Sequence, residues 1–355
     1  MGIIIRQSAR GTILTYIGTF IGFITTGVII PKVLSTNQVG LTQILIAYTL
    51  VFVQLGSLGF NNVTTRMFTY FRDDRSKHNG FLFIALTVTL TGFLLCLCAY
   101  FIIKPVLIER SADKSALFVE YIYYLIPLVF FTMIFNTLDN YYKVLYNAVI
   151  GIILKELVAR LFILATVIMY FFDIITFSSF ILFYIISYCS PTVIIIISLI
   201  KDGQFNLVPK SGFVTKELAK TMSSVALFGI ISGFAGVVTL SIDRIMINDI
   251  FKMGLDRIGV YGIAFLFGTV IILPSRSLLK ISSAIIADAW KENNMETLKT
   301  VYCKSCLNQF IIAALLYIGV LANLHNIFKI LPEEYADGMY VIVLIGLAYL
   351  IDMTI

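Results

Sequence analysis

Two ionisable residues, Asp243 and Arg244, stand side by side directly after an apolar stretch of membrane-spanning length. That stretch, 221–242, has no charged residue, and a second uncharged stretch, 258–275, ends at Arg276. Charge placed against a membrane span is costly, so such residues are by default functional hypotheses. Contact with a substrate or a role in gating is one interpretation. The alternative is that these three residues anchor the span ends at the membrane interface, where long cationic side chains reach the headgroups.

The residue types that carry enzyme chemistry in soluble proteins do not form a pattern here. His78 and His325 are the only histidines and lie far apart in the sequence, so a histidine-based triad or zinc site lacks partners. Cys303 and Cys306 form a C-x-x-C without a second ligand pair or a thioredoxin-like context, which favours free thiols. We therefore expect no enzyme, no metal site and no cofactor.

Composition indicates a membrane protein. Hydrophobic residues make up 59% of the 355 residues and charged residues 13%, with a mean hydropathy of +0.96. A soluble domain carries about a quarter charged residues. The net charge of +6 then reflects basic loops at one membrane face and gives no indication of nucleic-acid binding.

The elements that must position Asp243, Arg244 and Arg276 are membrane helices. Apolar stretches near bilayer length, separated by polar segments, predict an all-α integral membrane protein of about ten transmembrane helices. The predicted spans are 11–31, 40–63, 80–103, 121–138, 146–172, 174–200, 221–242, 258–275, 305–328 and 338–355.

The fifth predicted span is the most polar. It carries Lys155, Glu156 and Arg160 within an otherwise apolar stretch. Glu156 and Arg160 are spaced i, i+4 and can pair on one face of a helix. Because a paired charge is already satisfied, the spacing favours a structural role over a site.

Lysine and arginine counts predict the orientation. With the N-terminus inside, inner loops hold 17 of the 26 basic residues, outer loops hold 7, and Arg244 and Arg276 are left within spans. Basic residues accumulate on the cytoplasmic side, so we expect a cytoplasmic N-terminus.

A GxxxGF motif occurs in the first span, at Gly18 and Gly22, and again in the seventh, at Gly229 and Gly233. Such small-residue pairs let a neighbouring helix approach closely. The recurrence hints at two halves that face the same way, a parallel repeat. Chance recurrence is the alternative, since the motif is common in membrane helices.

Several segments resemble the polysaccharide flippases, the O-antigen and capsule transporters of the multidrug/oligosaccharidyl-lipid/polysaccharide exporter superfamily. The start of the chain and the pair of spans around Asp243 carry the resemblance. The matching stretches are RQSARGT (6–12), YIG (16–18), IGF (21–23), Pro31, VGL (39–41), IDRIMI (242–247), IGVYGIA (258–264) and PSR (274–276).

The resemblance implies a bacterial inner-membrane protein with two lobes of six helices each. We expect an N-terminal lobe over 1–200, a cytoplasmic linker over 201–220 and a C-terminal lobe over 221–355. The chain ends within its tenth predicted span, so the second lobe is expected to be incomplete.

The implied function is movement of undecaprenyl-diphosphate-linked oligosaccharide from the inner to the outer leaflet for surface polysaccharide or lipopolysaccharide synthesis. The implied partners are this lipid-linked oligosaccharide, the lipid bilayer, a polysaccharide polymerase and other glycan-assembly proteins, but no nucleic acid. A cation-coupled multidrug exporter of the same superfamily and a non-transporting scaffold in glycan assembly are the alternatives.

The implied task assigns roles to the charged residues. The planar fork of arginine binds phosphate oxygens in pairs, so cations in the spans suit a diphosphate. Asp243 could hold Arg244 in place or take part in ion coupling. The candidate diphosphate ligands are Arg10, Arg66, Arg244 and Arg276.

Overall fold

The computed structural model describes residues 2–111, 114–210, 212–275, 286, 289–290, 292 and 294–354, with the backbone alone for 2–10. Within these residues the chain is helical and contains no strand. The predicted all-α class is confirmed. Helices follow from the sequence because every backbone polar group must be satisfied within the segment once the surrounding solvent is hydrocarbon.

Nine helices in the described part of the chain are long and apolar enough to cross a membrane. They match nine of the ten predicted spans, with ends shifted by several residues. Their bounds are Gly11–Val33, Thr36–Gly56, Lys77–Ser111, Ala116–Val144, Phe177–Lys201, Lys216–Ile250, Leu255–Ile272, Met295–Ala322 and Glu333–Asp352.

The remaining predicted span, the fifth, is a helix as well. It consists of α8 (Ala148–Ile152), the π-helical segment η4 (Ile153–Val158) and α9 (Ala159–Phe171), which follow one another without a break. Its three charged residues, Lys155, Glu156 and Arg160, make it more polar than the nine helices above. The helix nevertheless reaches roughly 36 Å at about 1.5 Å per residue, enough to cross the hydrocarbon core.

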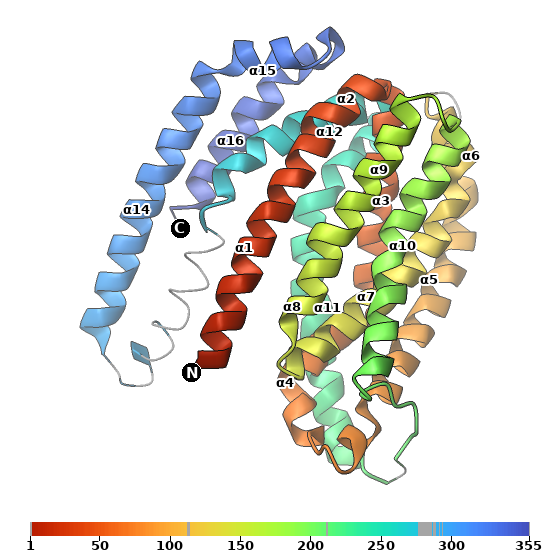
Figure 1. Cartoon of the computed structure of the whole chain (residues 1–355), viewed down its shortest axis with the longest axis vertical. Helices are drawn as coiled ribbons and strands as arrows, with labels where there is room; N and C mark the ends of the chain where they lie inside the picture. Colours follow the sequence, from red (N-terminus) through yellow and green to blue (C-terminus); the bar gives the residue numbers. More distant parts are fainter. Residues whose placement is uncertain are drawn as a thin grey trace. The chain divides into compact units, whose positions relative to one another are not determined.

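Contacts divide the chain into two compact units. The first comprises residues 2–22 and 37–258, and Figure 1 shows its helices running alongside one another. Besides α8, η4 and α9, it holds α1 (Gly2–Ile24) up to Gly22, α3 (Thr36–Gly56), α4 (Phe60–Phe71), η2 (Lys77–Gly80), α5 (Phe81–Ser111), α6 (Ala116–Tyr121), η3 (Ile122–Tyr124), α7 (Leu125–Val144), α10 (Phe177–Lys201), α11 (Lys216–Ile245) and η5 (Met246–Ile250).

The second unit comprises residues 23–36 and 259–354. In its core Ile271 and Ala313 are buried, and Gly346 lies against Tyr317 and Ile271. The predicted lobes, 1–200 and 221–355, are defined by a repeat of six helices and not by contacts, so they stay a prediction. The elements of this unit are η1 (Thr25–Ile29), α2 (Ile30–Val33), α12 (Leu255–Gly268) from Gly259, η6 (Thr269–Ile272), α14 (Met295–Ala322), α15 (Leu324–Ile330), η7 (Glu333–Gly338) and α16 (Met339–Asp352).

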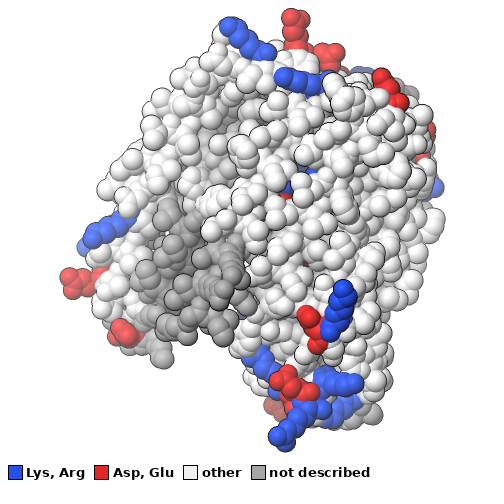
Figure 2. All heavy atoms as spheres, in the orientation of Figure 1, with Lys and Arg blue, Asp and Glu red and all other residues white. Residues whose placement is uncertain are grey.

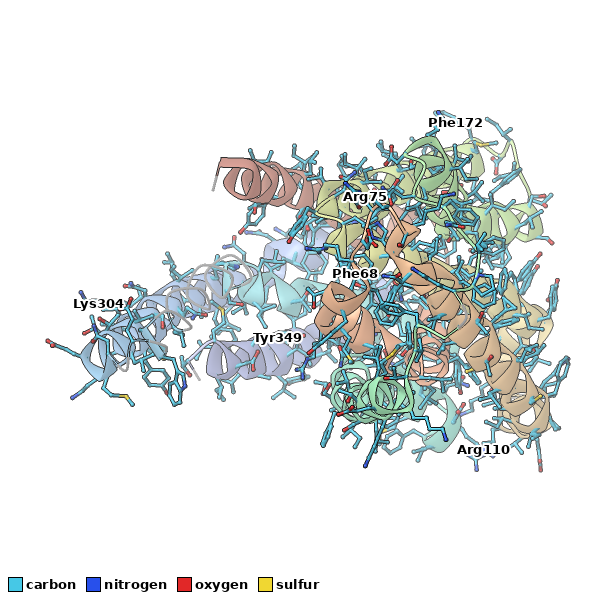
Figure 3. All side chains as sticks on the ribbon, turned by 90° about the horizontal axis from the view of Figure 1, so that it is seen from below. Phe68, Arg75, Arg110, Phe172, Lys304 and Tyr349 are labelled. Atoms are coloured by element: carbon cyan, nitrogen blue, oxygen red, sulfur yellow. The ribbon has the colours of Figure 1, made fainter. Side chains whose placement is uncertain are left out.

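An aromatic cluster fills the end of the first unit where α4 lies. Phe68, labelled in Figure 3, meets Phe81 edge-on at 5.3 Å and Tyr141 at 5.7 Å between ring centroids. Phe71 meets Phe81 at 5.0 Å. These rings come from α4, α5 and α7, so they fix three helices at one end of the bundle.

The second predicted span, 40–63, ends earlier than expected. α3 stops at Gly56, and α4 begins at Phe60 after Gly59, whose backbone is left-handed with φ +68°. A side chain at Gly59 would also strike the carbonyl group of Ala226 in α11. Glycine is thus required twice, for its backbone conformation and for the close approach of α11.

The surface of the first unit suits a bilayer. Large apolar side chains such as Phe20, Ile102 and Phe228 are exposed along its helices. In Figure 2 a group of charged side chains lies around α4 and the loops beside it, at the bottom of the view; others lie along the upper right edge, and the surface between is mostly uncharged. Exposed basic residues there are Arg72, Arg75, Lys77, Lys143, Lys201 and Lys210.

Candidate functional site

The predicted site residues lie on separate elements. Arg66 is exposed on α4, and Arg10 belongs to α1, of which only the backbone is described at that position. Arg276 lies outside the described residues. Among the residues that can be placed, Asp243 and Arg244 are neighbours on α11, and Arg66 lies on the helix that packs against α11.

Asp243 and Arg244 are half-buried near the C-terminal end of α11. Arg244 Nη1 donates to the carbonyl oxygen of Leu240, one turn earlier, at 2.9 Å. The helix continues beyond them as η5, so Asn248 and Asp249, which follow the predicted span 221–242, lie in a π-helical segment and not in a loop. Arg244 therefore lies within a helix that runs on for a further turn.

A second arginine, Arg160, lies at the middle of the fifth helix. Its Nη2 forms an ion pair with Glu156 Oε2 at 2.5 Å, so the predicted i, i+4 pairing is confirmed. Its Nη1 donates to the carbonyl oxygen of Gly18 in α1. The Arg160 and Glu156 side chains are 28% and 22% exposed, so both are partly accessible.

The GxxxG pair of α1 makes room for this arginine and glutamate. A Cβ atom at Gly18 would lie 2.8 Å from Glu156 Cβ, and one at Gly22 would lie 2.8 Å from Arg160 Cζ. The close approach predicted from the motif is therefore confirmed, and its partner is the charged turn of the fifth helix. Glu156 itself lies in η4, and π-helical segments occur frequently at functional sites.

Stability alone does not explain a charged pair at this depth. A partly exposed ion pair such as this one contributes at most about 1 kcal/mol. An ionisable residue inside a membrane span is a functional hypothesis by default. The sequence favoured a structural role for Glu156 and Arg160, and only their position beside Gly18 brings out the functional alternative.

A buried polar junction lies just beyond the C-terminal end of α11, in η5. The Tyr48 hydroxyl of α3 donates to Asp249 Oδ2. Asn248 accepts from the Ser115 hydroxyl at 2.8 Å and donates to Ser111 Oγ at 2.9 Å. It also donates to Asp249 Oδ1 at 2.7 Å. Asn248 and Asp249 fall between the predicted spans 221–242 and 258–275, and no local pattern reveals partners more than a hundred residues away.

We expect Asn248→Leu to lower the free energy of unfolding by about 2–4 kcal/mol. The change leaves Ser111 and Ser115 without the amide, and each buried polar group left unsatisfied costs roughly 1–3 kcal/mol. Thermal unfolding of the purified protein in detergent measures the effect. Asn326→Leu, on the exposed surface of α15, is the control. Equal melting temperatures for the two variants would show that the junction contributes little.

A cavity of about 340 Å³ opens where the loop after α4 meets the ends of α7 and α10. Its arginine, Arg72, donates to the carbonyl oxygen of Val144 at 2.5 Å and to the Tyr146 hydroxyl at 2.6 Å. The guanidinium also lies 4.5 Å from the centre of the Tyr146 ring. Arg72 thus caps the C-terminus of α7, which makes it a structural residue.

The loop that forms this cavity wall is organised by short polar contacts. Asp73 accepts from the backbone of Arg75 at 3.0 Å, and the side chain of Ser76 lowers the pKa of the Asp73 carboxyl. His78 is buried and lies 3.1 Å from Gln204 Oε1 through Nε2. The contacts hold residues 77–79 in left-handed backbone conformations, which is uncommon for residues other than glycine.

Comparison with known proteins identifies the fold. Neither the protein-family models nor the curated proteins match this chain. A solved structure described as the inward-facing conformation of a multidrug resistance MATE family transporter of the MOP superfamily is similar, with a TM-score of 0.70. The match covers 96% of this chain and 80% of that chain at 14% sequence identity. The chain is a multi-pass membrane protein with the fold of a MATE transporter.

Proposed function

We propose that this protein is a transporter that moves oligosaccharide linked to undecaprenyl diphosphate across the bacterial inner membrane, with its N-terminus in the cytoplasm. Two arguments support the proposal: the MATE-like fold and the resemblance of several segments to polysaccharide flippases. The proposed substrate combines a polar glycan, an anionic diphosphate and an apolar tail. The tail can remain in lipid, so the protein must provide a path for the other two parts.

The observation that carries the proposal is the distribution of arginines in the first unit. Arg66 lies on α4, near the charged end of the unit, Arg160 at the middle of a helix, and Arg244 toward the far end of α11. From Ala226, which contacts Gly59 next to α4, α11 rises roughly 27 Å to Arg244 at about 1.5 Å per residue. That rise is comparable to the hydrocarbon thickness of about 30 Å.

Guanidinium groups at successive depths suit an anion that must cross the membrane. Each can form paired hydrogen bonds to phosphate oxygens, which ammonium groups cannot do in the same fixed geometry. The charge of the diphosphate would thus be compensated at several stages of its passage. The resemblance to polysaccharide flippases makes a polysaccharide polymerase and other glycan-assembly proteins the proposed partners.

Reconstitution tests this function directly. Labelled undecaprenyl-diphosphate-linked oligosaccharide is incorporated into proteoliposomes, and the fraction that an added glycosidase can cleave is followed with time. We expect this fraction to rise above the value for protein-free liposomes. An unchanged fraction, with protein shown to be folded and inserted, would refute the proposal.

Multidrug export is the second candidate, because the similar solved structure is that of a multidrug resistance transporter. The same proteoliposomes distinguish the two functions. Efflux of a cationic dye driven by a sodium or proton gradient, without movement of the glycan lipid, would favour drug export.

A further inference from the structure

Arg160 and Glu156 form an ion pair whose role in transport is not defined by the distribution of arginines alone. The pair lies halfway along the helix formed by α8, η4 and α9, and both side chains are partly exposed. Roughly 18 Å of helix precedes Arg160 and roughly 17 Å follows it, at about 1.5 Å per residue. In a helix that crosses the bilayer, a cation at this position is as far from both helix ends as the helix allows.

The surroundings hold the guanidinium in place while leaving it donors for a ligand. Nη1 donates to the Gly18 carbonyl oxygen, and Nη2 contacts Glu156. A guanidinium has five N–H donors, so two contacts do not exhaust it. Gly22 lets α1 pass close beside the guanidinium and hold it, because a Cβ there would lie only 2.8 Å from Arg160 Cζ.

Glu156 provides the counter-charge that an unliganded arginine needs in a membrane. The carboxylate resembles a phosphate group in that both present oxygens that a guanidinium binds in pairs. Glu156 and a substrate phosphate would therefore compete for the same donors. An ion pair of this kind keeps the empty site neutral and still permits exchange for an external anion.

We propose that Arg160 is a diphosphate subsite and that Glu156 is the internal carboxylate that a diphosphate displaces from it. This inference rests on the proposed function for its ligand. Binding exchanges one anionic partner of Arg160 for another, and release returns Glu156 to the guanidinium. The exchange limits how tightly the diphosphate is held at mid-membrane, which transport requires because a tightly held substrate does not leave.

Binding of a soluble polyprenyl diphosphate to the purified full chain tests the exchange. Farnesyl diphosphate is titrated against the wild type and Glu156→Gln, which removes the competing charge but keeps a side chain of similar size. We expect the Kd of Glu156→Gln to be about tenfold lower. Glu217→Gln, which changes the net charge equally at an exposed site in the first turn of α11, should bind like the wild type.

The double variant Glu156→Gln/Arg160→Gln shows whether the gain acts through Arg160. It removes both members of the ion pair, so neither charge is left without the other; it should therefore fold, and its melting temperature checks this. We expect it to lose the tenfold gain. Unchanged affinity in Glu156→Gln, or a gain that persists in the double variant, would overturn the proposal.

Two further ligands identify what the site recognises. Farnesol lacks phosphate, and an equal gain for farnesol would overturn the proposal. If Glu156→Gln also binds inorganic diphosphate more tightly, the site accepts free diphosphate. If only the affinity for farnesyl diphosphate increases, the site accepts a diphosphate carried by a lipid. Either result supports the subsite. Movement of the glycan lipid in liposomes without any effect of Glu156 on binding would refute this inference alone. A Glu156-dependent gain without such movement would refute the proposed function alone.

Discussion

Replacing Gly18 with leucine is expected to destabilise the protein far more than the same change at Gly236. A Cβ atom at Gly18 would lie 2.8 Å from the Glu156 carbonyl carbon. Because this neighbour is backbone, α1 and the fifth helix would have to separate. Overpacking of this kind costs typically about 1–3 kcal/mol, occasionally more. The shift would also take the Gly18 carbonyl oxygen away from Arg160 Nη1, leaving the guanidinium with fewer partners.

Gly236 provides a matched comparison, since it lies within α11 and nothing stands within 4 Å of a Cβ placed there. Leucine at this position should be neutral or slightly stabilising, because glycine costs about 1 kcal/mol in a helix interior. Thermal unfolding in detergent and the amount of folded protein recovered from membranes measure both variants. If Gly18→Leu melts at the temperature of Gly236→Leu, the close approach of α1 to the fifth helix is wrong.

Hydropathy predicted the helices well because the bilayer imposes one solution on every apolar segment. The spans at 11–31, 174–200 and 258–275 match observed helices, although helix ends differ by several residues. The end of α3 at Gly56 was not predicted. The segment that follows, Phe60–Phe71, is also helical, so its sequence does not mark where one helix ends and the next begins. The break depends on Gly59 and on α11, which passes beside it.

The charged contacts show where sequence patterns stop being informative. Pairing of Glu156 with Arg160 follows from their i, i+4 spacing, and the GxxxG motif predicts that some helix approaches α1. No pattern indicates that these two features meet, because Gly18 and Arg160 are 142 positions apart. The junction around Asn248 is similar, since its serine partners are 133 and 137 positions away. Tertiary packing decides both sites.

Arg244→Ala is expected to reduce movement of the glycan lipid by about tenfold or more. The side chain is half-buried on α11, where its Nη1 donates to the Leu240 carbonyl oxygen of the same helix, so the guanidinium lies at the end of the span that the diphosphate would reach last. Hydrogen bonds to charged groups contribute roughly 1.5–3 kcal/mol each, and 1.4 kcal/mol corresponds to a factor of ten. The initial rate of glycan-lipid movement in proteoliposomes, at equal amounts of inserted protein, measures the loss.

Two further variants separate substrate contact from anchoring. Arg244→Lys keeps the charge but loses the paired geometry of the guanidinium, so we expect a rate between those of the wild type and Arg244→Ala. Arg257→Ala removes the same charge from the first turn of α12, where the side chain lies 3.9 Å from Asp256 and is 47% exposed. An exposed pair of this kind contributes at most about 1 kcal/mol, so transport should remain near normal. If Arg244→Ala and Arg257→Ala transport equally well, Arg244 anchors α11 at the membrane surface and does not bind the diphosphate.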